Sequence, residues 1–164
     1  TGTDPLSYLA DRVLDPIGLR TAGWIHDPAG NPMLPYGAWT TAWEWAKYGV
    51  LLLDDGAWQG EQVLPAGALS RCTEGSAANP GYGLTFWLNQ EVPEGVDLSA
   101  FDTLSEEGRI LWPEGDADLY AAAGHDDQRL YVLPSRDTIV VRLGDGHRKF
   151  EDAELLALLF GSSR

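Results

Sequence analysis

Apolar residues recur at intervals of three and four positions in two stretches of the first third of the chain, residues 5–14 and residues 42–53. This spacing places them on one face of an α-helix, so each stretch predicts a helix. Asp4, with a proline after it, is a favourable start for the first helix. Thr40 or Thr41 can cap the second helix in the same way.

A loop and one short helix are expected around these two helices. Residues 20–38 show no sustained period and hold three prolines, so they predict a loop. Two aspartates and a glycine at 54–56 end the second helix. A further short helix is expected over residues 65–71.

The second half of the chain changes to the alternating pattern of β-strands. The stretches that predict strands are residues 82–88, 119–123, 128–133 and 138–143. Residues 134–137 form a four-residue turn, so the last two strands should pair as an antiparallel hairpin. Residues 150–160 return to helical spacing. Helices, then an antiparallel sheet flanked by helices, predict an α+β fold built in layers.

One long stretch departs from both patterns. Residues 91–118 hold nine acidic side chains and a single basic one, Arg109, with prolines and glycines scattered throughout. A connection of this length without its own periodic pattern is uncommon in a compact domain. We interpret it as an acidic insertion over the surface, which could serve as a lid.

The amino-acid composition excludes some classes of partner and of protein. The chain has 25 acidic and 11 basic residues among 164, which gives a formal net charge of −14. Nucleic acids and anionic membranes both attract clustered lysine and arginine, so neither is an expected partner. With 44% hydrophobic residues the chain can bury a core, and no apolar run approaches the roughly 20 residues of a membrane span. The single cysteine, Cys72, excludes an intrachain disulfide and leaves the redox compartment open.

The most polar cluster of the strand region is His125-Asp126-Asp127, and it allows several interpretations. Imidazole and carboxylate groups suit a divalent metal ion, but adjacent strand residues point to opposite faces, and no spacing ties the cluster to another histidine. A polar corner between two strands is the simpler interpretation. Gly124 directly before it permits close approach of a ligand to the backbone, where a free N–H can act as an oxyanion donor.

The seven tryptophans of the chain could line an aromatic cleft or pack in the core. Trp45 falls on the apolar stripe of the second predicted helix, so core packing is expected for it. Trp39, close to Tyr36 in a predicted loop, is the better candidate for the wall of a cleft.

Three stretches, in this order along the chain, resemble the serine β-lactamase-like family of class C β-lactamases, related esterases and 6-aminohexanoate-dimer-type hydrolases. Residues 5–19 (PLSYLADRVLDPIGL) are similar to a family helix that ends in a P-L-G turn. Residues 36–49 (YGAWTTAWEWAKYG), followed by 51–60 (LLLDDGAWQG), are similar to the segment G-x-x-x-T-A-x-D-x-A-R-F-G-x-L-L-L-x-x-G. Residues 120–134 (YAAAGHDDQRLYVLP), with 137–142 (DTIVVR), are similar to the late strand pair of the family.

The resemblance implies a β-lactamase/transpeptidase-like, three-layer αβα hydrolase that cleaves esters or small amides through an acyl-enzyme. Neither the nucleophile motif Ser-x-x-Lys of the family nor its Tyr-x-Asn motif occurs in this sequence. The residues three positions before the two lysines, Lys47 and Lys149, are Glu44 and Gly146, and no tyrosine is followed two positions later by asparagine. In the family both motifs lie upstream of the first helix seen here. We therefore expect residues 1–164 to be the C-terminal part of a single hydrolase domain, incomplete and inactive alone.

The start of the chain agrees with that expectation. It begins with TGTD, without an initiator methionine and without a visible signal peptide, so the compartment stays undetermined. The expected partners are a small-molecule ester or amide substrate and the missing N-terminal part of the same domain or a partner chain. A processed terminus is the alternative explanation of this start.

The resemblance also implies where substrate would meet this chain. The Lys/His-Thr-Gly strand of the family falls on residues 122–125, so the backbone N–H of His125, or of a neighbour within one residue, would be the second oxyanion donor. The first donor would be the N–H of the absent serine. The residues implied to bind substrate are Gly124, Asp126, Tyr36 and Trp39. No cofactor and no metal ion is implied.

The sequence departs from the family pattern at two places. The chain has no Lys-Thr-Gly triplet, whose cation normally helps hold the carboxylate of an antibiotic, so esters or small amides are favoured over penicillins. Asp127 stands where relatives often have glycine.

The sequence also allows two alternative functions. The first is a catalytically dead member of the family, and the second is an unrelated acidic ligand-binding module whose tryptophan-rich loops hold a carbohydrate or peptide.

Overall fold

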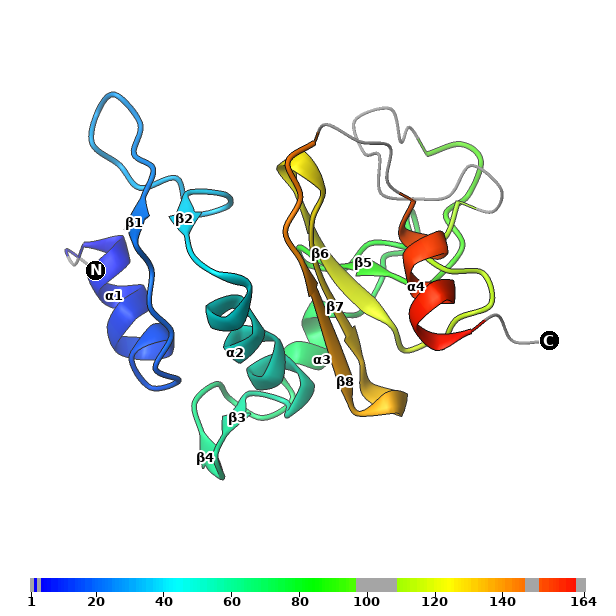
Figure 1. The fold of residues 1–164 in the computed structure, drawn as a ribbon, viewed down its shortest axis with the longest axis horizontal. Helices are drawn as coiled ribbons and strands as arrows, with labels where there is room; N and C mark the ends of the chain where they lie inside the picture. Colours follow the sequence, from blue (N-terminus) through cyan, green and yellow to red (C-terminus); the bar gives the residue numbers. More distant parts are fainter. Residues whose placement is uncertain (1, 3, 97–108, 147–150, 162–164) are drawn as a thin grey trace.

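The computed structural model describes residues 2, 4–96, 109–146 and 151–161. At its centre lies a four-stranded antiparallel sheet in the order β5-β6-β7-β8. Its strands are β5 (Trp87–Leu88), β6 (Tyr120–Gly124), β7 (Gln128–Leu133) and β8 (Thr138–Arg142). Helix α2 (Ala42–Leu53) covers one face of the sheet and α4 (Asp152–Phe160) covers the other (Figure 1). The chain is therefore an α+β protein with antiparallel pairing, as predicted.

The side chains of β7 point alternately to the two faces of the sheet, and this explains why each face is covered by a helix. The residues of β7 that pack on the α2 side are Leu130 and Val132, and those that pack on the α4 side are Tyr131 and Leu133. All of them are fully buried. Since successive strand side chains point to opposite faces, a strand that is apolar at consecutive positions needs cover on both sides.

Helix α2 has the bounds that the sequence predicts. Thr41 Oγ1 accepts a hydrogen bond from the Glu44 N–H at 3.2 Å, which satisfies one of the unpaired donors at the helix start. Gly49 brings the helix close to the sheet, because a Cβ built there would lie 2.8 Å from Leu130 Cδ1 and 3.0 Å from Ile139 Cδ1.

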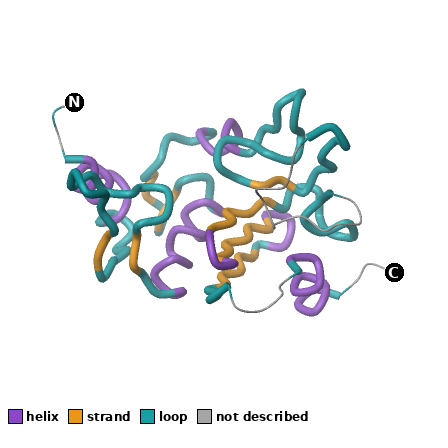
Figure 2. Tube along the Cα trace, turned by 90° about the horizontal axis from the view of Figure 1, so that it is seen from above, coloured by secondary structure: helices purple, strands orange, loops and turns teal. Residues whose placement is uncertain are grey.

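The N-terminal segment lies on the far side of α2 from the sheet, and its helix α1 and the C-terminal helix α4 lie at opposite ends of the molecule (Figures 1 and 2). Its elements are α1 (Pro5–Leu9), a π-helical turn (Ala10–Leu14), β1 (Gly23–Trp24) and β2 (Ala38–Trp39). Ile17 and Leu19 of this segment pack against Leu51 of α2. The helix thus has apolar neighbours on both of its sides.

Short elements and turns connect the larger helices and strands. Between α2 and β5 along the chain come β3 (Ala57–Trp58), β4 (Glu61–Gln62) and α3 (Ala68–Cys72). Single 3-10 turns, His125–Asp127 and Pro134–Arg136, join β6 to β7 and β7 to β8. The second turn confirms the predicted hairpin. No helix of the described residues combines the length and apolar character needed to cross a membrane.

The prediction of one strand over residues 82–88 is wrong. The Gly83 N–H donates to the Phe86 carbonyl at 2.9 Å, and Thr85 has a φ of 76°, so the chain turns back on itself within this stretch. Only Trp87–Leu88 pairs with β6, while Tyr82 forms an isolated bridge to Trp87. Alternating aromatic residues predict which side chains are buried, but they do not exclude a left-handed turn between them.

Three helix and loop boundaries also differ from the predictions. The helix over 5–14 is α-helical only to Leu9, after which the Asp15 N–H donates to the Ala10 carbonyl in the wider π pattern. The loop over 20–38 contains β1 and the start of β2. The helix expected over 65–71 begins later, at Ala68, after Gly67 with φ of 73°.

The ends of the acidic stretch 91–118 contribute to the core. Val92, Leu111 and Trp112 are fully buried. The buried Asn89 side chain binds the Trp112 backbone on both sides, since Oδ1 accepts the N–H at 2.9 Å and Nδ2 donates to the carbonyl at 2.9 Å. This corrects the surface interpretation for the two ends. Residues 97–108 lie outside the described residues, so their placement stays a prediction.

Candidate functional site

The end of β6 is uncovered on one side. Strand β5 pairs with β6 only at Tyr120 and Ala121, whereas β7 pairs with it as far as Gly124. On the β5 side, no strand of the described residues pairs with β6 beyond Ala121, and both Gly124 and His125 are exposed. The backbone at this end of the strand is therefore open to a ligand or to further polypeptide.

The turn that follows has an unusual backbone. Asp126 and Asp127 are both left-handed, with φ of 56° and 60°, and the Gln128 N–H donates to the His125 carbonyl. Aspartate is one of the few L-residues that enter this region without a large steric cost. Asp127 thus has the backbone conformation that favours glycine.

Side chains from β7 and β8 hold this turn in place. Gln128 Nε2 donates to the Gly144 carbonyl at 2.7 Å, and its Oε1 accepts the Gly144 N–H at 3.2 Å. Arg142 Nη1 donates to the Asp127 carbonyl at 2.6 Å. The Asp127 carbonyl of the left-handed turn is therefore bound within the fold, and Gln128 joins the start of β7 to Gly144 after β8.

A buried ion pair lies between β7 and the first residue of α4. Arg129 Nε donates to Asp152 Oδ1 at 2.9 Å, Nη2 donates to Oδ2 at 3.3 Å, and both side chains are 2% exposed. Tyr131 Oη donates to Asp152 Oδ1 at 2.5 Å. Burial, together with the charge of Asp152, raises the pKa of Tyr131 above its ordinary value, so the phenol stays protonated. The carboxylate thus receives three hydrogen bonds, which a buried charge requires.

Arg129 also reaches the end of β6. Its Nη1 donates to the Gln128 carbonyl at 3.1 Å and to the Gly124 carbonyl at 3.4 Å. Reasoning from the sequence missed this network, because Asp152 follows Arg129 by 23 residues. The available signal was the arginine itself, since a charged residue inside a buried apolar strand needs a carboxylate partner.

The side chains of His125 and Asp126 are exposed, with Nε2 of the histidine 3.4 Å from Oδ1 of the aspartate. In the part of the chain that the structure describes, no three histidine, cysteine, aspartate or glutamate side chains gather as metal ligands do. His147 lies outside that part.

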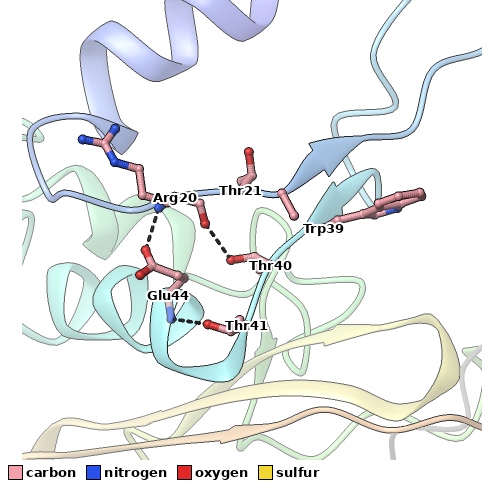
Figure 3. Close-up of a pocket in the computed structure, with 7 residues that line it drawn as sticks. Arg20, Thr21, Trp39, Thr40, Thr41 and Glu44 are labelled. Carbon is pink, nitrogen blue, oxygen red and sulfur yellow. Dashed lines mark hydrogen bonds between the residues drawn. The ribbon is translucent and has the colours of Figure 1, made fainter.

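A separate cleft of about 430 Å³ lies where the N-terminal segment meets α2 (Figure 3). The residues that line it are Arg20, Thr21, Ala22, Trp39, Thr40, Thr41 and Glu44. Its polar groups bind one another: Glu44 Oε2 accepts the Arg20 N–H at 2.6 Å, and Thr40 Oγ1 donates to the Arg20 carbonyl at 3.1 Å. Lys47 Nζ donates to both carboxylate oxygens of Glu44 at 2.8 Å and to the Gly18 carbonyl at 2.6 Å. These hydrogen bonds hold residues 18–20 against α2.

Tyr36 and Trp39 are both 60% exposed. The indole of Trp39 points away from Glu44 (Figure 3) and lies over Gly23, where a built Cβ would be 3.6 Å from the ring. None of the residues at 124–126 lines this cleft. The structure therefore does not bring the two aromatic residues and the strand end into one pocket, and their contact with substrate stays a prediction.

No protein-family model matches the chain, and no curated protein matches it either. The resemblance to the β-lactamase-like family therefore rests on the sequence motifs.

Proposed function

We propose that this chain is the C-terminal part of a β-lactamase-like serine hydrolase, in which the peptide bond between Gly124 and His125 (the 124–125 peptide) supplies one oxyanion donor. The observation that carries the proposal is the uncovered end of β6, where exposed backbone adjoins a turn held by Gln128 and Arg142. A sheet between α2 and α4 is compatible with the three-layer αβα fold of that family.

The proposed chemistry is acyl transfer from an ester or small amide. As a nucleophile adds to the substrate carbonyl, negative charge develops on its oxygen, and a backbone N–H already aimed at that position stabilises it. The His125 N–H would be one such donor and the N–H of a nucleophilic serine the other. In this proposal the serine and its lysine belong to polypeptide outside these 164 residues, because the sequence contains no Ser-x-x-Lys motif.

In this proposal, residues 1–164 are part of a longer protein, which we call the parent protein. The proposal predicts hydrolase activity in the parent protein and none in residues 1–164 alone. The coding sequence upstream should contain Ser-x-x-Lys and Tyr-x-Asn. The parent should release a burst of p-nitrophenol from an activated ester, and a serine-directed phosphonate should abolish the burst. A burst from residues 1–164 alone, or an upstream sequence without Ser-x-x-Lys, would contradict the proposal.

Two neighbouring substitutions in the parent test the role of the backbone. Gly124 has a φ of −113° and is exposed, and a Cβ there would lie 3.4 Å from its nearest neighbour, Gln128 Cβ, so the backbone can accept a residue with a Cβ. We expect Gly124→Val to block substrate and lower kcat/KM by about 10²–10³-fold, the loss seen when one oxyanion donor is removed. His125→Ala keeps the N–H and should cost less than about tenfold. Equal losses would contradict a backbone role.

A second candidate function is the binding of a carbohydrate or peptide. The exposure of Tyr36, Trp39 and Trp43, at 60%, 60% and 85%, favours it, since large aromatic side chains open to solvent mark binding surfaces. Saccharide binding by the parent without covalent labelling by the phosphonate would support this function. A catalytically dead family member would instead show a β-lactamase-like upstream sequence that lacks the nucleophile.

A further inference from the structure

The 124–125 peptide has a binding partner on its carbonyl side. No cis peptide bond occurs among the described residues, so the C=O and the N–H of this peptide point in opposite directions across one rigid plane. The Gly124 carbonyl accepts a hydrogen bond from Arg129 Nη1 at 3.4 Å. Whatever holds the carbonyl therefore also determines where the His125 N–H points.

The donor to that carbonyl is itself held firmly. Two nitrogens of the Arg129 guanidinium bind the Asp152 carboxylate, and Tyr131 Oη binds the same carboxylate from the side. Arg129 Nη2 also lies 3.8 Å from Asp127 Oδ1. A guanidinium is planar, so binding two of its nitrogens fixes the direction of the third, and burial excludes water that could replace these bonds.

We propose that Arg129 is a positioning residue that sets the direction of the His125 N–H, and this inference rests on the proposed function, in which that N–H meets the oxyanion. The contacts run from Asp152, the first residue of α4, through the guanidinium to the 124–125 peptide. A cationic donor at the carbonyl oxygen also polarises the peptide group, which makes its N–H a stronger donor.

Arg136 offers a matched comparison, because it is bound at the opposite end of β7. It pairs with Asp116 and lies over the rings of Trp112 and Phe160, with its guanidinium carbon 5.2 Å and 5.0 Å from their centroids. No contact joins it to the 124–125 peptide in the hydrogen bonds of the described residues. An Arg→Lys change at this position therefore perturbs a structural arginine without touching the proposed site.

The direct test is made on the 164-residue chain by nuclear magnetic resonance. Arg129→Lys keeps the charge but removes the planar fork, so we expect the ¹³C resonance of the Gly124 carbonyl and the amide resonance of His125 to shift, and exchange of the His125 amide to change. Arg136→Lys should leave all three unchanged. Unchanged signals in a folded Arg129→Lys variant overturn the inference. If that variant does not fold, Tyr131→Phe, which keeps both charges, must shift the same signals, and their constancy overturns it.

Kinetics in the parent protein separate this inference from the function on which it rests. Arg129→Lys should lower kcat about tenfold with KM nearly unchanged, because a misdirected donor weakens an interaction made only in the transition state. A parent that the phosphonate does not label overturns the proposed function, whatever the resonances of residues 1–164 show. A labelled parent whose kcat is unaffected by Arg129→Lys overturns the positioning role and leaves the proposed function standing.

Discussion

Glu44 shows how one carboxylate can join segments that are distant in the sequence. It accepts hydrogen bonds from Lys47 Nζ and from the Arg20 N–H, and these two, in that order, lower the pKa of Glu44 from its ordinary 4.5. The folded protein thus favours the ionised form. This contribution to stability is complete above the unfolded pKa and is lost as the pH falls through the lower, folded pKa.

We therefore expect Glu44→Gln to lower the free energy of unfolding at about pH 7, with the difference from wild type shrinking as the pH falls below about 4. Urea unfolding over this pH range measures the effect. Glu61→Gln, at an exposed position of β4, is the control and should change stability little at any pH. A destabilisation by Glu44→Gln that does not depend on pH would contradict the assigned role.

Helix α2 packs closely against the sheet at Gly49. Gly49 faces Leu130 and Ile139 at distances that leave no room for a Cβ unless these side chains move. We expect Gly49→Val to destabilise the protein by about 1–3 kcal/mol, the range for overpacked cores, although valine is the better helix former.

Chemical denaturation would measure this change in unfolding free energy. Trp43→Val introduces the same residue at an exposed position of the same helix, and should stay within about 0.5 kcal/mol of wild type. If both variants are equally stable, Gly49 does not lie in close contact with the sheet.

The molecule as a whole leaves apolar surface uncovered. Among the described residues, β8 is an edge strand of the four-stranded sheet, and Leu158 and Leu159 of α4 are 85% and 52% exposed. Open strand edges and exposed apolar side chains favour association. The net charge of −14 opposes association between copies as long as salt does not screen it.

We expect residues 1–164 to bind a hydrophobic dye and to associate as the salt concentration rises from about 20 to about 500 mM, where charge screening is strong. Sedimentation velocity measures the association. Leu158→Gln combined with Leu159→Gln should reduce both effects while leaving the far-ultraviolet circular dichroism unchanged. A monomer that binds no dye at high salt would argue against the expectation that further polypeptide completes this domain.

Elements that are stabilised by residues close along the chain could be predicted from the amino-acid pattern. The bounds of α2, a cap at Thr40 or Thr41, and the β7–β8 hairpin follow from hydrophobic period and turn chemistry over short stretches of chain. The structure selects Thr41 as the cap. The sequence also placed Gly124 and His125 at the end of a strand, which is the candidate site as far as its backbone is concerned.

Contacts between groups that are distant along the chain could not be predicted, because they depend on how the layers pack. The partner of Arg129 lies 23 residues away on α4, and the buried Trp112 comes from a stretch whose acidic composition predicts a surface position. A periodic pattern predicts which face of a helix or strand is apolar, but it does not predict which other element packs against that face. Ion pairs and hydrogen bonds between distant residues form only after the layers have packed, and here they hold the turn beside the candidate site.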